Sequence, residues 1–232
     1  IPNEVYSITG LKLKAQSPFP ATFNIELANG AAGYIPPPHQ HDLGGYTTWP
    51  ARTAGLEVQA EPKIVETLLS SLESLAGNPR KEPNASVGAY AQAILAEKPL
   101  AFWRCQEFGG GMLKDLTGHE RDGKIEGPIA YHLPGPDHAS FSGEAVNRSL
   151  QLAGGTVSME VPGARSLSFW FWNGLDSKVR ENTGDLLQLG EALRLRIGGK
   201  GDGASRGKLI LQIGERIFKG SSQTALRGWH HV

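Results

Sequence analysis

The second part of the chain is built from short alternating runs separated by Gly, Asp and Asn, and this pattern constrains the fold more than any other feature. Turn signals recur roughly every 8–12 residues, a spacing typical of an all-β sandwich. The runs are "LAFWR", "DGKIEG", "HASFSG", "SLQLAG", "TVSMEV", "SLSFWFWN", "DLLQLG", "ALRLRIGG", "KLILQIG" and "WHHV".

The run "SLSFWFWN" carries large apolar side chains on both faces. Phe171 faces one way, while Trp170 and Trp172 face the other. Such a strand is expected to be central, or to have its second face covered by a ligand or a neighbouring domain. Trp170 and Trp172 fit core packing and also stacking on sugar rings. His230 and His231 are adjacent on an inferred strand and point to opposite faces, which argues against a joint metal site.

The first part of the chain predicts a mixed arrangement. Residues 3–15 have helical spacing with Asn3 as a candidate N-cap, and residues 21–29 alternate like a strand with one buried face. Residues 61–77 predict a helix that stops at Gly77. We therefore expect an α+β fragment (helix, strand, loop, helix) over 1–77, a linker over 78–88 and an all-β jelly-roll sandwich over 89–232, with both domains truncated. A glycosylation sequon lies in the linker at 84–86.

The loop "NGAAGYIPPPHQHDLGGYTTWPARTAG", Asn29 to Gly55, is too long for a plain connector. Long ordered loops in compact domains are usually functional. Tyr34 opens the loop, a proline run stiffens its path, and a Gly-Gly pair permits a sharp return before Tyr46. The two tyrosines could thus converge on one point. Arg52 fits either a clamp for an acidic group or a hydrogen bond to the loop backbone.

Composition excludes several classes of function. The chain is 39% hydrophobic and 20% charged, with zero formal net charge and no block of Lys or Arg, so nothing indicates nucleic acid or an anionic membrane as a partner. No apolar run is long enough for a transmembrane segment. The lone Cys105 excludes an internal disulfide. No G-x-S-x-G, H-E-x-x-H or phosphate-loop motif is present.

The second part resembles a laminin-G-like, or concanavalin-A-like, jelly roll over about residues 90–232. The stretches that carry the resemblance are "EKPLAFWRCQE", "DLTGHERDGKIEG", "NRSLQLAGG", "SLSFWFWN", "GKLILQIG" and "GWHHV". The resemblance implies a module that binds sugars or proteins, with bound calcium possible. Asp115 and Asp122, the candidate calcium ligands, are explained equally well as turn formers.

The first part resembles the C-terminal edge of the catalytic domain of neutral/alkaline (non-lysosomal) ceramidases. The matching stretches are "PNEVYSITGLKLK", "TFNIELANGAAGYIPPPHQHDLGGYTTWPAR" and "AEPKIVETLLSSL". The resemblance implies that Glu4 and Tyr34 are zinc ligands and that Tyr46 donates a hydrogen bond in the transition state. In that family two histidines from upstream complete the zinc site. The motif departs from the family at Asn3, where Gly is common, and in the proline run 36–38.

The implied chemistry is reasonable on general grounds. Zinc lowers the pKa of water from 15.7 to roughly 7 and polarises the carbonyl under attack. A phenol can serve as a ligand because the cation favours its deprotonated form, and a second, protonated phenol can donate to the developing oxyanion.

Each candidate residue also has a purely structural interpretation. Glu4 fits a solvated position in a first helical turn, where a negative charge suits the helix dipole. Tyr34 and Tyr46 fit half-buried anchors whose hydroxyls have a partner. His39 and His41 are two residues apart in a proline-rich loop, which favours surface histidines over a metal pair.

Two functional hypotheses follow. The chain opens at Ile1 inside a patterned element and closes on "GWHHV", so we expect a piece of a longer bacterial-type protein, secreted or periplasmic at the cell envelope. In the first hypothesis the parent is a ceramidase-like zinc amidohydrolase that cleaves an amide-linked lipid or a related small substrate. Its jelly roll binds a glycan or surface, and this piece alone is inactive. In the second, the protein is a non-catalytic adhesion or carbohydrate-binding protein with a degenerate N-terminal scaffold.

Overall fold

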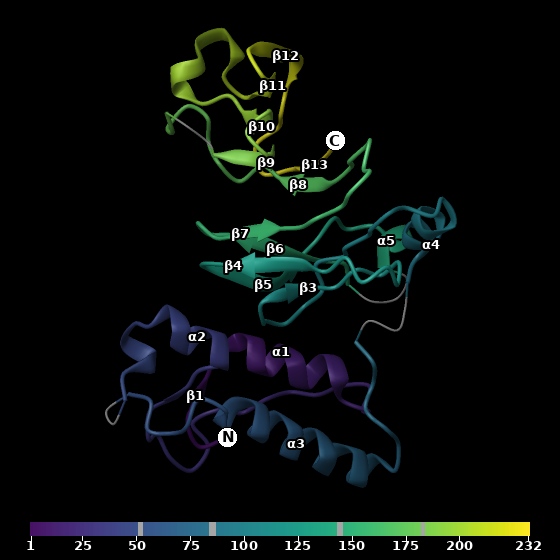
Figure 1. Cartoon of the computed structure of the whole chain (residues 1–232). Helices are drawn as coiled ribbons and strands as arrows, with labels where there is room; N and C mark the ends of the chain where they lie inside the picture. Colours follow the sequence, from purple (N-terminus) through teal and green to yellow (C-terminus); the bar gives the residue numbers. More distant parts are fainter. Residues whose placement is uncertain (51–52, 84–86, 143–145, 182–183) are drawn as a thin grey trace. The chain divides into compact units, whose positions relative to one another are not determined.

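The computed structural model describes residues 1–50, 53–83, 87–142, 146–181 and 184–232. It divides into two compact units, Ile1–Gly163 and Ala164–Val232. The described residues form few helices and many antiparallel strands, and the strands make several small sheets (Figure 1). The expected α+β composition with a largely β second part is confirmed at this level. Arg52 and the sequon at 84–86 lie outside the described residues.

Two helices build the N-terminal region of the first unit. α1 (Ser7–Gln16) packs against α3 (Ala60–Ala76), and the two lie side by side in Figure 1. The residues buried in the core that they share are Leu13, Val65 and Leu69. The helix predicted over 61–77 is confirmed as α3. It ends because Gly77 adopts a φ of +67°, a left-handed conformation that glycine takes without steric cost.

A buried ion pair joins the same two helices. The Glu61 carboxylate, in the first turn of α3, is fully buried and accepts a hydrogen bond from the Thr9 hydroxyl at 2.8 Å. The Lys12 ammonium donates to both of its oxygens, at 2.9 and 3.0 Å. A buried carboxylate is stable only when such donors replace its lost hydration. This network therefore holds α1 and α3 in one register.

The helix predicted over residues 3–15 is wrong at its start. Strand β1 (Glu4–Val5) comes first and pairs in parallel with β2 (Tyr34–Ile35), and the helix begins only at Ser7. The helical spacing was real, but the first residues find backbone partners in the loop, and tertiary pairing overrides local propensity.

Asn3 does not cap the helix. Its Oδ1 atom accepts a hydrogen bond from the Ala32 amide at 3.0 Å, and the N-cap position is taken by Tyr6, which makes no side-chain cap. Asn3 is buried. The residue therefore anchors the loop that leads to β2.

The strand predicted over residues 21–29 is also wrong. No ladder forms there, and the alternating apolar side chains face solvent: Phe23 is 81%, Ile25 61% and Leu27 48% exposed. The Leu27 amide donates to the Asn3 carbonyl at 3.4 Å, and the Ile25 carbonyl accepts from the amino group of Ile1 at 2.9 Å. An alternating pattern buries one face only when a neighbouring strand or layer covers it, and no described residue does so here.

Most regular elements in the remainder of the first unit are short strands. The antiparallel sheet of three strands contains β3 (Met112–Leu113), β4 (Gly123–Glu126) and β7 (Thr156–Ser158), and β5 (Ile129–Pro134) pairs with β6 (Arg148–Leu152). The short helices are α4 (Ala89–Ala96) and α5 (Ala139–Ser142). The buried core contains Leu113, Ile125 and Ile129.

Two of the predicted strands do not form in this region. The run "LAFWR" makes only an isolated bridge between Trp103 and Asp115, and the run "HASFSG" contains α5. Strand β5 was not predicted, although it makes the longest ladder of the unit with β6.

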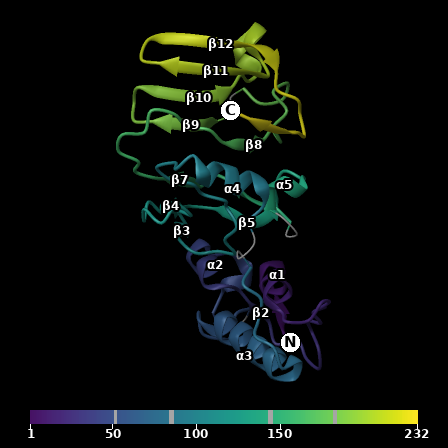
Figure 2. The same cartoon turned by 90° about the vertical axis from the view of Figure 1, so that its right-hand side faces the viewer.

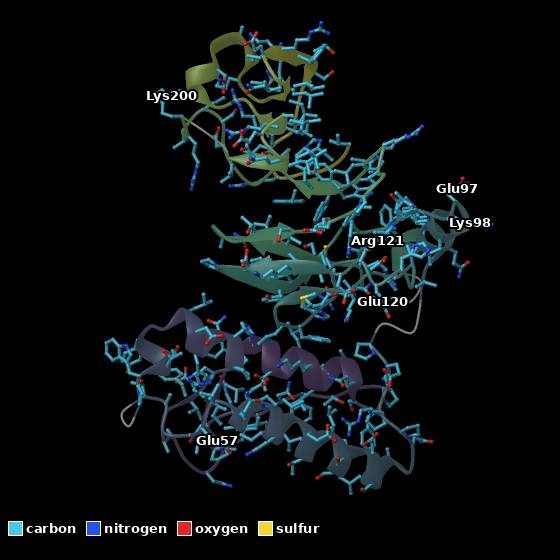
Figure 3. All side chains as sticks on the ribbon, in the orientation of Figure 1. Glu57, Glu97, Lys98, Glu120, Arg121 and Lys200 are labelled. Carbon is cyan, nitrogen blue, oxygen red and sulfur yellow. The ribbon has the colours of Figure 1, made fainter. Side chains whose placement is uncertain are left out.

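The turn that contains Asp115 and Asp122 is closed by its own hydrogen bonds. The Asp115 carboxylate accepts the amides of Phe102 and Arg121 (labelled in Figure 3) and both the amide and the hydroxyl of Thr117, at 2.8–3.2 Å. The Asp122 carboxylate accepts the Asp115 amide at 2.9 Å. These contacts are those of turn-forming residues.

The second unit contains a four-stranded antiparallel sheet and a separate strand pair. Figure 2 shows the sheet strands β9 (Asp185–Leu189), β10 (Leu193–Ile197), β11 (Lys208–Ile213) and β12 (Arg216–Gln223) in sequence order. β8 (Trp170–Trp172) pairs with β13 (Trp229–His231). The connection from β10 to β11 contains η2 (Lys200–Ser205), which a bidentate Arg196–Asp202 ion pair holds at 2.6 and 2.7 Å.

Candidate functional site

The parallel pairing of β1 with β2 places Glu4 directly beside Tyr34. The two residues are register partners, and the Glu4 amide donates to the Gly33 carbonyl at 3.1 Å. Neighbours in register project from the same face of a ladder. The next pair, Val5 and Ile35, projects from the opposite face, where Ile35 is only 2% exposed. The buried face thus orients Glu4 and Tyr34 toward the more open one.

The pKa of Tyr34 reflects its position beside Glu4. The Glu4 carboxylate raises the pKa of the Tyr34 phenol above its ordinary value, because ionised Tyr34 would be a second negative charge beside the first. Partial burial, the neighbouring Tyr46 and a side-chain hydrogen bond to Glu4 act in the same direction. Glu4 and Tyr34 are therefore an interacting acid and phenol, as the predicted site requires.

Tyr46 lies against Tyr34. Their ring centroids are 5.7 Å apart with an interplanar angle of 74°, and Trp49 extends the row at 5.6 Å from Tyr46. Such edge-to-face geometry is favourable for aromatic pairs. Tyr46 is 59% and Trp49 56% exposed, so the row is open to solvent. The structure brings together the three residues predicted for the site: Glu4, Tyr34 and Tyr46.

The path of the loop explains how Tyr46 returns to Tyr34. The proline run leads into α2 (Pro38–Leu43), with proline in its first turn. Gly44 and Gly45 then adopt φ values of +71° and +99°, which reverse the chain into η1 (Tyr46–Thr48). Positive φ is easily accessible only to glycine. The stiff entry and the glycine return were both expected from the sequence.

Tyr6 is a third phenol near this cluster, and it was not predicted for the site. Its hydroxyl hydrogen-bonds the Thr47 hydroxyl, and its proximity contributes to the raised pKa of Tyr34. Tyr6 follows β1 by one residue, at the N-cap of α1. A tyrosine two positions after Glu4 on an extended segment was the available signal, since it lies on the same side as Glu4.

The loop histidines have structural surroundings. His39 is half-buried, which lowers its pKa, and its ring lies edge-on to Tyr131 at 5.4 Å. In the part of the chain that the structure describes, no group of three or more His, Cys, Asp or Glu side chains could hold a metal ion. His39 and His41 belong to no such group, and both are partly buried rather than fully exposed.

The donor set of Glu4 and Tyr34 fits half of a zinc site. Zinc accepts carboxylate and other N or O donors at about 2.0–2.2 Å, and a catalytic zinc has three or more protein ligands. A cation between Glu4 and Tyr34 would reverse the effect that now raises the pKa of the phenol. Two oxygen donors alone are too few, so further ligands are needed to hold the ion.

Other titratable groups have surroundings that suit structure better than catalysis. Burial raises the pKa of the Cys105 thiol to about 12, so this thiol is protonated and a poor nucleophile at neutral pH. Burial lowers the pKa of His132 to about 4, and its ring stacks on Phe108 at 4.0 Å. For Asp115 and Asp122, calcium would compete with the hydrogen bonds that close the turn.

The pair of strands β8 and β13 carries a second aromatic group. Trp172 faces Trp229 at 5.6 Å and Trp170 faces His231 at 4.9 Å, all on one face of the ladder. Trp172 is 49% exposed. His230 lies on the opposite face, stacked on Phe171. The two histidines thus point to opposite faces, as predicted.

Of the helices in the described ranges, none has the length and apolar character that crossing a membrane requires. Comparison of the chain with known proteins gives no match to a family model, to a curated protein or to a solved structure.

Proposed function

We propose that this chain contributes part of the active site of a ceramidase-like zinc amidohydrolase. Glu4 and Tyr34 are two of the zinc ligands, and Tyr46 is the hydrogen-bond donor to the reacting carbonyl. One observation carries the proposal: the β1–β2 register sets Glu4 beside Tyr34 while the Tyr46 ring lies 5.7 Å from the Tyr34 ring. The resemblance supplies the other two ligands, histidines that precede Ile1 in the parent.

The chemistry assigned to each residue follows from its surroundings. When bound, zinc supplies Lewis acidity and activates the attacking water. Glu4 contributes negative charge at the site, and Tyr34 releases its phenolic proton to solvent when it becomes a ligand. Tyr46 donates its O–H to the carbonyl oxygen as negative charge develops there. Tyr46 and Trp49 are more than half exposed and can lie along the substrate.

The substrate that we propose is an amide-linked lipid or a related small amide. By the separate resemblance to laminin-G-like domains, residues 89–232 belong to a jelly roll that attaches the parent to a glycan or envelope surface, outside the cell or in the periplasm. The antiparallel sheets of both units support a β-rich module of this kind.

The test is zinc content and amidase activity of the parent and its variants. Glu4→Gln and Tyr34→Phe should each lower zinc occupancy and reduce kcat/KM by at least 100-fold, whereas Tyr46→Phe should retain zinc and lose about 10²–10³ in kcat. Tyr131→Phe is the matched control, because it also removes a phenolic hydroxyl, one that bonds the Gly110 carbonyl and none of the three site residues. The 232-residue chain alone should show neither tight zinc nor turnover. Full activity in Tyr34→Phe, or turnover by the chain alone, would contradict the proposal.

A second candidate function rests on the β8–β13 face. Trp170, Trp172 and Trp229 share that face, and Trp172 is half exposed, an arrangement on which a sugar ring can stack. In this case the protein is a non-catalytic carbohydrate-binding or adhesion module. Glycan binding that is lost in Trp172→Ala, together with a parent that has no metal dependence, would favour it. Unchanged glycan binding in Trp172→Ala would exclude this face as the binding site.

A further inference from the structure

Thr53 lies in a tight turn at the far end of the loop that carries Tyr34 and Tyr46. It is 8% exposed. Its amide and that of Ala54 both donate to the Trp49 carbonyl, at 3.2 and 2.9 Å. The residue follows the aromatic row in the chain but packs back onto the backbone of both tyrosines. Its contacts suggest that it joins the two halves of the loop.

The backbone of Thr53 holds Tyr34. The Thr53 carbonyl accepts the Tyr34 amide at 2.6 Å. The two segments approach so closely that a Cβ atom on Gly33 would lie 2.6 Å from the same carbonyl oxygen, and Gly33 also has a φ of +114°. Only glycine fits both constraints. The position of Tyr34 therefore depends directly on Thr53.

The side chain of Thr53 holds Tyr46. Its Oγ1 atom lies 2.5 Å from the Tyr46 carbonyl oxygen and 3.0 Å from that of Trp49. A hydroxyl carries one proton, so the shorter contact is its main hydrogen bond. Because the site is buried, removal of the hydroxyl would leave the Tyr46 carbonyl without this donor.

We propose that Thr53 is a positioning residue that sets the separation of Tyr34 and Tyr46, through its carbonyl on one tyrosine and its hydroxyl on the other. The effect of Thr53 on catalysis rests on the proposed function, whereas its effect on the positions of the two tyrosines does not. Thr53 acts through the backbone of the two tyrosines and does not itself contact the reacting atoms.

The structural content is tested by NMR on the 232-residue chain. In the wild type, the Tyr34 amide nitrogen should show a scalar coupling through its hydrogen bond to the Thr53 carbonyl carbon, and the Tyr34 and Tyr46 rings should show mutual NOEs. Thr53→Val removes the hydroxyl at constant shape and should at least halve those NOEs, whereas Thr53→Ser should restore them. Absence of the wild-type coupling would overturn the proposal whether or not any variant folds.

Thr48→Val is the matched control. Thr48 is also 8% exposed in the same loop, but its hydroxyl donates to the Gly45 carbonyl at 2.9 Å. The ring NOEs should survive in Thr48→Val, with the core signals of Leu13 and Leu69 reporting an intact fold in every variant. Equal loss of the NOEs in Thr48→Val and Thr53→Val would show that any buried hydroxyl of the loop has this effect, which contradicts a specific role.

The catalytic consequence is tested in the parent. Thr53→Val should lower kcat by about 10- to 100-fold, because small displacements of a catalytic group have effects of that size, and Thr53→Ser should recover most of the loss. An inactive wild-type parent would defeat the proposed function, while the NMR results would still decide the role of Thr53. Full activity in Thr53→Val would contradict a positioning role in catalysis.

Discussion

The aromatic row on the loop and the aromatic face of β8–β13 contain similar side chains at similar ring distances, but they are held in different ways. Tyr34, Tyr46 and Trp49 are brought together by a loop whose buried polar groups fix its path. The rings of Trp172 and Trp229 meet because the two residues are partners in a strand ladder. Regular pairing places side chains without special residues, whereas a loop needs particular hydrogen bonds.

The two groups also differ in charge. Tyr34 has a carboxylate beside it, so its titration is coupled to Glu4. On the face of β8 and β13 the ionisable member is His231, which hydrogen-bonds the Ser168 hydroxyl at 2.7 Å. An acid next to a phenol can hold a cation or move a proton, while an aromatic face supplies area for stacking. The loop thus contains interacting ionisable groups, whereas the ladder presents an aromatic surface.

The largest effect is expected from Glu61→Ala, because the helices that frame the loop depend on one buried carboxylate. The variant leaves Lys12 without its partner, and breaking a buried pair in this way costs roughly 3–5 kcal/mol. Hydrogen exchange of the α1 and α3 amides would measure the loss. Glu57→Ala removes an exposed partner of Lys63 (Glu57 is labelled in Figure 3) and should cost about 1 kcal/mol or less. Equal losses of stability in the two variants would show that the buried Glu61 ion pair stabilises this region no more than the exposed Glu57 ion pair.

The next effect is expected in the second unit. Phe171 is 7% exposed, so Phe171→Ala should destabilise that unit by about 3 kcal/mol. Trp172→Ala, at a half-exposed position on the other face, should have a clearly smaller effect. Amide exchange of β8 and β13 is the measurement. A larger loss in Trp172→Ala would mean that the Trp face is the packed one, and the proposed recognition surface would be ruled out.

A smaller effect is expected on the pKa of Tyr34, whose neighbouring carboxylate distinguishes the loop from the β8–β13 face. The pKa of Tyr34 lies above its ordinary value of 10.0, mainly because of Glu4. Glu4→Gln removes the negative charge and should move the pKa of Tyr34 down toward that value, which ¹³C NMR of the labelled phenol would follow. The conservative Glu4→Asp should retain most of the shift. A Tyr34 pKa that is the same in wild type and in Glu4→Gln would show that the charge of Glu4 does not act on Tyr34.

The smallest effect is expected at the surface of α3. Hydrogen bonds from Arg80 lower the pKa of Glu73 from 4.5 to about 2. Because the folded-state pKa is depressed, the stabilisation is complete above pH 4.5 and is lost as the pH falls toward about 2. The stability difference between wild type and Arg80→Ala should shrink over this range. A difference that does not depend on pH would show that Arg80 stabilises by packing alone.

Local patterns predicted those features that depend on nearby residues. The apolar spacing and Gly77 predicted α3, and the proline run with the Gly-Gly pair predicted the path of the loop. The alternating runs gave most strands of the second unit. The convergence of Tyr34 and Tyr46 was expected from the loop pattern, and Glu4 was added to them by the ceramidase resemblance. The roles of these residues in binding zinc and in catalysis remain predictions.

The features that were missed depend on contacts between distant segments. The sequence around Thr53 and Glu61 does not indicate that they are buried, because their partners are distant in the chain. Thr53 bonds the backbone of Tyr34 and Tyr46, and Glu61 bonds residues of α1. The alternation at 21–29 predicted a strand, yet a strand needs a neighbour that the described residues do not provide. By contrast, β5 is flanked by turn signals, Gly127-Pro128 before it and Gly135-Pro136 after it, so local pattern was sufficient to predict this strand and it was overlooked.

The most direct test of the central claim is the position of zinc in crystals of the parent, located by anomalous scattering at the zinc edge. We predict one site whose ion lies about 2.0–2.2 Å from a Glu4 carboxylate oxygen and from the Tyr34 phenolic oxygen, with Tyr46 beside it. Zinc bound elsewhere, with Glu4 and Tyr34 still facing each other without a metal, would contradict the claim.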